Sequence, residues 1–267
     1  MLIKKLVGPC SALFMLTGAA FAEETAEELA KKLSNPVAAM ISLPLQYNYD
    51  EDIGPAREGS KSTLNIQPVA PFTINERWNV ISRTILPIVD QRNVVPGSDG
   101  ASGVGDITQS LFFSPRKTGS SGLIWGAGPA FLLPTGSDDE LSAKKWAIGP
   151  TLVLLKQQSG TSYGALANHL WSVAGDKDRN DLSSTFLQPF LSHTTKTAWT
   201  YGANVESSYD WKAEQWSVPI NVTVAKLVKI SGKPMSFTGG VRYWAESPEN
   251  GPHGWGVRCA VTFLFAK

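Results

Sequence analysis

Hydrophobic and polar residues alternate along most of this chain with a period of two, and the alternation recurs in separate runs. In the first run, Ile41, Leu43 and Leu45 share one face, while Ser42 and Gln46 share the other. Because successive side chains of a β-strand point to opposite faces, each run predicts one strand. Twelve such strands are expected, at residues 41–50, 63–74, 77–88, 106–114, 123–135, 146–157, 163–173, 185–193, 199–210, 216–224, 236–243 and 255–265.

The number, length and polarity of these runs favour a membrane barrel. Several runs have the roughly 9–11 residues that a tilted strand needs to cross a bilayer. A sheet in lipid must close on itself, because the hydrocarbon offers no partners for backbone N–H and C=O groups. We therefore expect an all-β fold, a single closed antiparallel transmembrane β-barrel of about twelve strands with its apolar face toward lipid. A soluble periplasmic β-protein, which also alternates, is the alternative.

The first residues have the pattern of a secretory signal peptide. Lys4 and Lys5 precede an uncharged apolar stretch, and Ala20-Phe21-Ala22 is a small-x-small cleavage signal. Residues 1–22 are therefore predicted to be a signal peptide that is cleaved after Ala22. The competing interpretation is a membrane anchor, but the apolar stretch is short for a spanning helix.

A different segment, residues 23–38, separates the signal peptide from the barrel of residues 39–267. Thr25 and Glu28 have the spacing of a capping box, and Asn35-Pro36 marks a helix end. We expect a short periplasmic helix on or in the mouth of the barrel, with a solvated leader as the alternative.

Charge and cysteine content exclude several classes of function. Without Lys4 and Lys5 the chain has 22 basic and 23 acidic side chains, so no basic excess points to nucleic acid. Cys259 is the one cysteine that remains after cleavage, which rules out an internal disulfide and a thiolate zinc site. No cofactor and no metal are expected.

Enzymatic activity is not expected either. The chain has no G-x-S-x-G motif, and its three histidines are His169, His193 and His253. Asn168 and His169 are neighbours and would face opposite sides of a strand. An outer-membrane lipid hydrolase is kept as a distant alternative.

The predicted connections alternate between long and short. The long ones are expected at residues 51–62, 90–105, 136–145, 174–184 and 245–254, and they resemble the outer loops of such barrels. Acidic residues in these loops, including Asp50, Asp138 and Asp176, are expected to be solvated charge; the alternative is divalent cations that bridge to lipopolysaccharide. Gly103-Val-Gly-Asp106 is expected to begin a strand after an outer loop.

Charged residues on the polar faces are the best functional candidates. Six of them are predicted to line the lumen and set its selectivity: Arg77, Arg83, Glu206, Asp210, Arg242 and Arg258. They can line an aqueous path, or they can pair across the lumen and fill it. Glu206 or Asp210 would then pair with Arg242 or Arg258.

Several short motifs, in this order, resemble a known family. They are Glu28–Pro36, Ile41–Asn48, Gly103–Asp106, Gln188–Phe190, Trp216–Asn221 with Lys226, and Trp255–Phe265. The chain resembles the outer-membrane transporters named after the MetA pathway of phenol degradation. This resemblance implies an outer-membrane barrel with a transport role and no catalytic residues.

The expected function is a channel in the cell outer membrane that passively admits a small solute, with aromatic and hydrophobic compounds as candidates. The alternative is a structural or lipid-interacting barrel with a filled lumen. Expected partners are outer-membrane lipid and lipopolysaccharide, the barrel-assembly machinery and an unidentified small solute.

Overall fold

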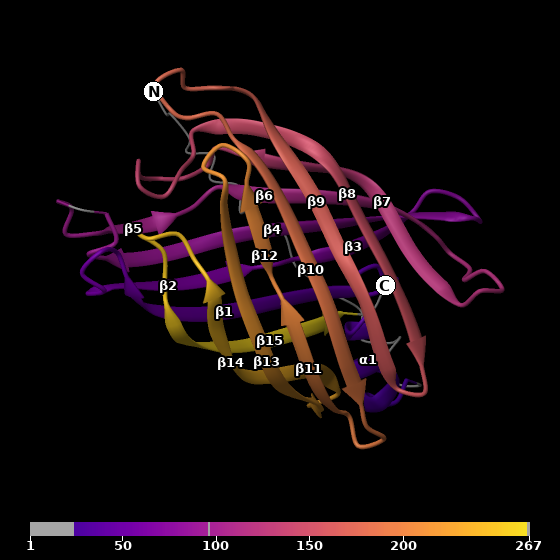
Figure 1. Cartoon of the computed structure of the whole chain (residues 1–267). Coiled ribbons are helices and arrows are strands. Elements are labelled where there is room, and N and C mark those ends of the chain that lie inside the picture. The colour runs from indigo at the N-terminus through magenta and orange to yellow at the C-terminus, as the bar shows by residue number, and fades with distance from the viewer. Residues whose placement is uncertain (1–23, 96, 266–267) are drawn as a thin grey trace, which may run out of the picture.

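The computed structural model describes residues 24–95 and 97–265, so the predicted signal peptide lies outside it. One helix and fifteen strands make up the described chain (Figure 1). They are α1 (Ala26–Leu33), β1 (Ile41–Ile53), β2 (Gly59–Ile66), β3 (Val69–Thr73), β4 (Trp78–Arg92), β5 (Ala101–Val104), β6 (Ile107–Pro115), β7 (Leu123–Leu133), β8 (Lys145–Gln158), β9 (Thr161–Gly175), β10 (Ser183–Thr194), β11 (Trp199–Val205), β12 (Ser207–Asp210), β13 (Gln215–Ile230), β14 (Lys233–Glu246) and β15 (Gly254–Phe265). No helix among these residues is long and apolar enough to cross a membrane.

The fifteen strands form twelve wall strands of a closed barrel. Short breaks divide three wall strands into the pairs β2 and β3, β5 and β6, and β11 and β12. All neighbours are antiparallel, and β15 pairs with β1 from Ile41 opposite Phe265 to Tyr49 opposite Val257, which closes the wall. The expectation of a closed antiparallel barrel of about twelve strands with a short N-terminal helix is confirmed.

The outer face of the wall is apolar. In β8, Trp146, Ile148 and Leu152 are exposed, while the intervening Ala147 and Thr151 are buried. The same alternation follows β13 and β14, where large apolar side chains also point away from the lumen. An apolar exterior of this extent matches the lipid-facing surface of a membrane barrel.

The lumen is less polar than the sequence predicted. Buried Ile81, Phe112, Val153, Leu155 and Leu166 form an apolar cluster inside the side of the wall made by β4 and β6–β9. In these strands the inward positions are apolar as well as the outward ones, so the alternation of polar and apolar residues is weak there. The lumen therefore has an apolar side and a polar side.

The two ends of the barrel differ in their connections. At the terminal end, where β1 begins and β15 ends, β8–β9 and β13–β14 are joined by the two-residue turns Ser159-Gly160 and Ser231-Gly232. All four of these residues have positive φ, as type I′ hairpin turns require. The gap between the predicted strands 216–224 and 236–243 is longer than the observed turn, because Gly232 provides this conformation and β13 and β14 both continue to the turn.

The opposite end, which we call the loop end, carries the longer connections 93–100, 134–144, 176–182 and 247–253. Three of them, 93–100, 176–182 and 247–253, are shorter than predicted, since strands such as β4 extend beyond the apolar run, whereas 134–144 is one residue longer than the predicted 136–145. Two prolines that fall within predicted strands interrupt the regular pairing: Pro219 lies at a register shift and Pro68 at the break between β2 and β3.

Helix α1 occupies the terminal end of the lumen. Thr25 and Glu28 form the predicted capping box at its start. Leu29 is fully buried and packs with Leu227 and Leu264, and Figure 1 shows α1 and the C-terminal end of the chain at the same end of the barrel. The helix is thus packed inside the mouth rather than left as a solvated leader.

The chain after α1 crosses to the apolar side of the lumen. Val37 is buried in the cluster with Phe112 and Val153. A Cβ atom at position 126 would lie 3.1 Å from Val37 Cγ1 and 3.2 Å from Phe112 Cβ. Because Gly126 has no side chain, Val37 can pack closely against β7 at this position. The segment of residues 26–40 therefore acts as a plug that contacts both sides of the wall.

Candidate functional site

A network of ion pairs crosses the polar side of the lumen. Arg258 donates to Glu206 through Nη1 at 2.8 Å and Nη2 at 2.7 Å, a bidentate pair. Arg242 Nη2 lies 4.0 Å from the same carboxylate, and its Nη1 donates to Asp50 at 3.3 Å. The side chains of Arg242 and Arg258 are 9% and 5% exposed, so these pairs lie inside the protein rather than at its surface. Two of the pairs that the sequence predicted for a filled lumen, Glu206 with each arginine, are present.

Asp50 belongs to this network, although the sequence placed it in a solvated loop. It lies within β1 because that strand continues to Ile53, and it also accepts from Trp244 Nε1 at 2.8 Å. Asp50 is opposite Lys61 in the β1–β2 pairing. Its burial and its ionic partner could not be seen from the sequence, because an acidic run before a glycine resembles a loop.

Arg83 is the fourth cation on the inner wall. Its Nη2 donates to Gln67 Oε1 at 3.2 Å, and among the described residues no carboxylate lies within 4.0 Å of its guanidinium. We call Asp50, Lys61, Arg83, Glu206, Arg242 and Arg258 the central cluster. It contains four cations and two anions and thus has an excess of two positive charges.

Two of the six predicted lumen residues lie outside the central cluster. Arg77 is exposed in the turn before β4, where its backbone N–H donates to Asn75 Oδ1. Asp210 is exposed at the end of β12 and accepts from the backbone N–H groups of Lys212 and Ala213. Both residues are an even number of positions from inward-facing residues of the same wall strand. They lie at the end of that strand, however, and not in the lumen.

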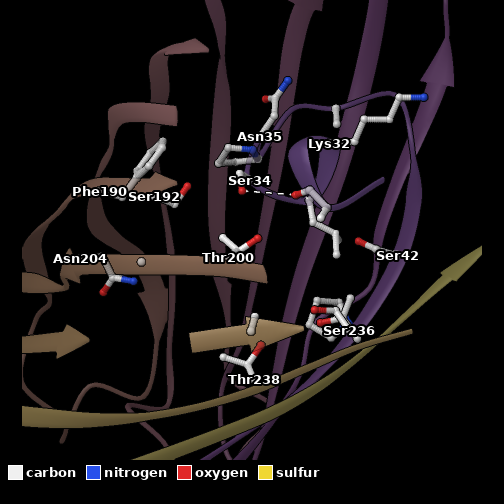
Figure 2. Close-up of a pocket in the computed structure, with 18 of the residues that line it drawn as sticks. Lys32, Ser34, Asn35, Ser42, Phe190, Ser192, Thr200, Asn204, Ser236 and Thr238 are labelled. Atoms are coloured by element: carbon white, nitrogen blue, oxygen red, sulfur yellow. Dashed lines mark hydrogen bonds between the residues drawn. The ribbon is translucent and has the colours of Figure 1, made fainter. Parts of the chain in front are cut away.

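A cavity of about 350 Å³ lies between the plug and the polar side of the wall. Figure 2 shows Ser42, Ser236 and Thr238 on one side of it and Phe190 and Asn204 on the other. Hydroxyl side chains dominate the polar lining: Ser42, Ser192, Thr200, Thr223, Ser236, Thr238 and Thr262. Arg83, Gln67 and Gln188 also line the cavity, so it reaches from the plug to the central cluster.

The loop end of the lumen is covered by the connection 134–144. Asp106 accepts from Gly136 N–H at 3.0 Å, Ser142 Oγ at 2.7 Å and Ala143 N–H at 2.7 Å. Glu140 in this loop accepts from the buried, inward-facing Gln91 at 3.2 Å. The Gly103–Asp106 stretch was expected to begin a strand after an outer loop, but Gly103 and Val104 end β5, and Gly105 and Asp106 form the break before β6. At this break, Asp106 holds the connection 134–144 in place.

His169 lies in an aromatic cluster on the outer face, between Trp171 and Trp211. Its ring stacks near Trp171, with 4.1 Å between centroids, and Nδ1 is 2.7 Å from Thr185 Oγ1. Trp211 Nε1 donates to the same Thr185 hydroxyl at 2.8 Å, and Ser183 Oγ lies 3.4 Å from Nε2 of the His169 ring.

The acidic loop residues are paired with lysines or with the backbone. Asp139 lies 2.6 Å from Lys144, and Asp181 lies 3.1 Å from Lys145. These lysines hold the pKa of each carboxyl below its usual value. In residues 24–95 and 97–265, no group of three or more His, Cys, Asp or Glu side chains is arranged to hold a metal ion.

Comparisons with known proteins give a family and a fold. A family model described as "Putative MetA-pathway of phenol degradation" matches residues 60–257. No curated protein sequence matches the chain. An outer membrane channel from Pseudomonas putida F1 has a similar structure, with a TM-score of 0.67 and 13% identity, over 85% of this chain and 96% of that one. At this identity the likeness concerns the fold.

Two further solved structures are similar over comparable lengths. Outer membrane phospholipase A from Escherichia coli has a TM-score of 0.46 and 9% identity, over 84% of this chain and 92% of its own. The β domain of the Bordetella autotransporter BrkA has a TM-score of 0.44 and 9% identity, over 85% and 100%. Their TM-scores are too low to support an argument about function.

Proposed function

The chain belongs to the family of the "Putative MetA-pathway of phenol degradation", and on this premise we propose that it is an outer-membrane channel that passively admits a small solute. The observation that carries the proposal is the cavity between the plug and the polar wall, which extends to the central cluster inside a closed barrel. A polar, charged path inside an apolar shell is what a passive channel requires.

The two ends of the barrel support one orientation in the membrane. Outer-membrane barrels have short periplasmic turns and longer outer loops, so the terminal end would face the periplasm and the loop end the outside. The plug would then lie at the periplasmic exit, and the loop held by Asp106 would lie at the outer mouth. Export through a signal peptide cleaved after Ala22 belongs to the same proposal, as do contacts of the outer loops with lipopolysaccharide.

The solute path would have two chemically different sides. Apolar side chains such as Phe190 and Leu166 face the cavity from one side, and hydroxyl groups such as Thr223 and Thr238 face it from the other. A wall of this kind suits a small solute with both apolar and polar surface, which is consistent with aromatic and hydrophobic compounds as candidates.

The ion pairs of the central cluster favour a second candidate, a structural barrel with a filled lumen. Glu206 is bound by Arg258 and approached by Arg242, and these contacts link strands across the polar side. If they also block the passage, the barrel would have a structural or lipid-interacting role.

Liposome swelling separates the two candidates. The full mature chain, reconstituted into liposomes, should let the neutral sugar arabinose enter faster than protein-free liposomes do, and it should carry ionic current in planar bilayers. Absence of both swelling and current would exclude the channel and favour the filled barrel. Lipid hydrolysis, assayed in the same liposomes with wild type and His169→Ala, tests the distant enzymatic alternative.

A further inference from the structure

The cavity beside the plug presents one partly buried cation, Arg83, with no carboxylate among the described residues within 4.0 Å of its guanidinium. We propose that this cavity binds a small organic monocarboxylate with an apolar body, whose carboxylate pairs with Arg83 and whose body contacts Phe190 and Leu166. This inference rests on the proposed function, because the cavity is taken as part of the solute path.

The three lumen arginines differ in their partners. Arg242 and Arg258 contact Asp50 or Glu206, whereas the one described hydrogen bond of the Arg83 side chain goes to the neutral amide of Gln67. Guanidinium has N–H donors in a planar fork that matches a carboxylate. Glu206 attracts Arg83 only from beyond 4.0 Å and is already bound by Arg258, so an anion in the cavity would give the Arg83 guanidinium the direct ionic contact that the other two arginines have.

Asn204 adds a second donor to the same cavity. Its Oδ1 accepts from Asn221 Nδ2 at 2.8 Å, an arrangement that directs the amide Nδ2 of Asn204 away from this contact. Among the described hydrogen bonds, none uses Asn204 Nδ2. The amide and the guanidinium come from β11 and β4, on different parts of the wall, and both line the cavity.

The opposite lining explains why the ligand would have an apolar body. Phe190, Leu166 and Val69 contribute to the apolar side of the lumen and also line the cavity. Its volume of about 350 Å³ lies at the lower end of the roughly 300–1,000 Å³ typical of small-molecule sites. The space therefore suits one ring or a short chain with one charged group.

The test compares an acid with its uncharged counterpart. Cyclohexanecarboxylate and cyclohexylmethanol have the same ring, so calorimetric titration of the full mature chain in detergent isolates the effect of the charge. We expect wild type to bind the acid about tenfold more tightly than the alcohol, a typical worth of one charge-assisted contact. Equal affinities for the two probes would overturn the proposal without any variant.

Variants then assign the effect to Arg83. Arg83→Gln should lose about tenfold in affinity for the acid and less than about twofold for the alcohol, while Arg83→Lys, which keeps the charge but not the planar fork, should retain part of the preference. Arg92→Gln, the same change at an exposed position of the same strand, is the matched control and should bind like wild type. If Arg83→Gln keeps wild-type affinity for the acid, or loses both probes equally, the proposal is wrong.

Folding and transport are measured separately, so that the failures are distinguishable. Heat-modifiable migration on gels shows whether each variant forms the barrel, and Asn204→Ala provides a second, milder test if Arg83→Gln does not fold. Arabinose swelling reports the channel itself. Swelling without Arg83-dependent binding overturns the carboxylate site alone, whereas binding without any swelling overturns the channel.

Discussion

At the scale of single residues, Glu206 is the side chain on which the ion network depends. It stands at the break between β11 and β12, where its backbone N–H donates to Pro219 O at 3.0 Å, and its carboxylate receives both Nη atoms of Arg258. The break thus places one acid within reach of two arginines from β14 and β15. The negative charge of Glu206 reduces the repulsion among the four positive charges of the central cluster.

Removal of this charge should destabilise the barrel strongly. Glu206→Gln would leave Arg258 and Arg242 without their shared anion, and breaking a buried pair in this way costs about 3–5 kcal/mol. Urea unfolding in phospholipid vesicles measures the loss. The matched control is Asp210→Asn on the same wall strand, which is exposed and should change stability by less than about 0.5 kcal/mol. Equal losses in the two variants would contradict this account.

The residue scale also shows where sequence reasoning reached its limit in the site. Alternation places Arg77 and Arg83 on one face of their strand, and Glu206 and Asp210 on one face of theirs. For Arg83 and Glu206, which belong to the central cluster, the predicted inward face is correct. It contains no information about depth: at about 3.3 Å per residue, Arg77 lies roughly 20 Å along the strand from Arg83. A charge near a turn and a charge in the lumen therefore look alike in the sequence.

At the scale of elements, the strands were predicted well at their centres and poorly at their ends. The apolar alternation stops where the wall leaves the lipid, since both faces can then be polar. β4 accordingly continues through Asp90 to Arg92, and β1 through Glu51 to Ile53, in stretches that were expected to be loops. The helix was predicted from its capping box, but its docking partners Leu227 and Leu264 lie far away in the sequence and no local pattern identifies them.

The docking of α1 should depend on pH through its capping box. Hydrogen bonds from the backbone N–H of Thr25, and then from its hydroxyl, lower the pKa of Glu28 from its ordinary value of 4.5. Since the pKa is lower in the folded state, the stabilisation is complete above pH 4.5 and is lost as pH falls through the folded value. A spin label at Lys32→Cys, in a Cys259→Ser background, should become more mobile in that range. Glu28→Gln, which does not titrate, should remove the transition; an unchanged transition would exclude Glu28 as its origin.

The plug should be released by a change at its buried contact. Leu29 is fully buried against Met40, Ala198 and Leu227, and Leu29→Ala should cost about 2–5 kcal/mol of docking energy. We expect faster trypsin cleavage after Lys31 and Lys32 and a higher conductance in planar bilayers. The same substitution at Leu33, a half-buried position on the same helix, should give a smaller effect. If Leu29→Ala is cleaved no faster than Leu33→Ala, the plug is held by something other than this cluster.

At the scale of the whole molecule, the two sides of the lumen follow from the order of the wall strands. The apolar inner side is built by consecutive strands, β4 and β6–β9, and the hydroxyl and charged side by β11–β15 together with β1. Because the wall is closed, the two groups of inward-facing side chains face one another across the interior instead of lying side by side on one face of an open sheet. The amphipathic cavity is therefore a consequence of closure between the first and last strands.

Closure can be tested directly with the chain's own cysteine. Tyr47 of β1 is paired with Cys259 of β15, and both side chains are exposed on the outer face. Paired residues have Cα atoms about 4.5–5.5 Å apart, within the roughly 4.4–6.8 Å that a disulfide spans. Oxidised Tyr47→Cys should therefore form an internal disulfide that makes the denatured chain migrate faster on non-reducing gels. Tyr49→Cys, which is paired with Val257, is the control and should cross-link much less. Equal cross-linking of the two variants would contradict this register, and no cross-linking of Tyr47→Cys would contradict a closed wall.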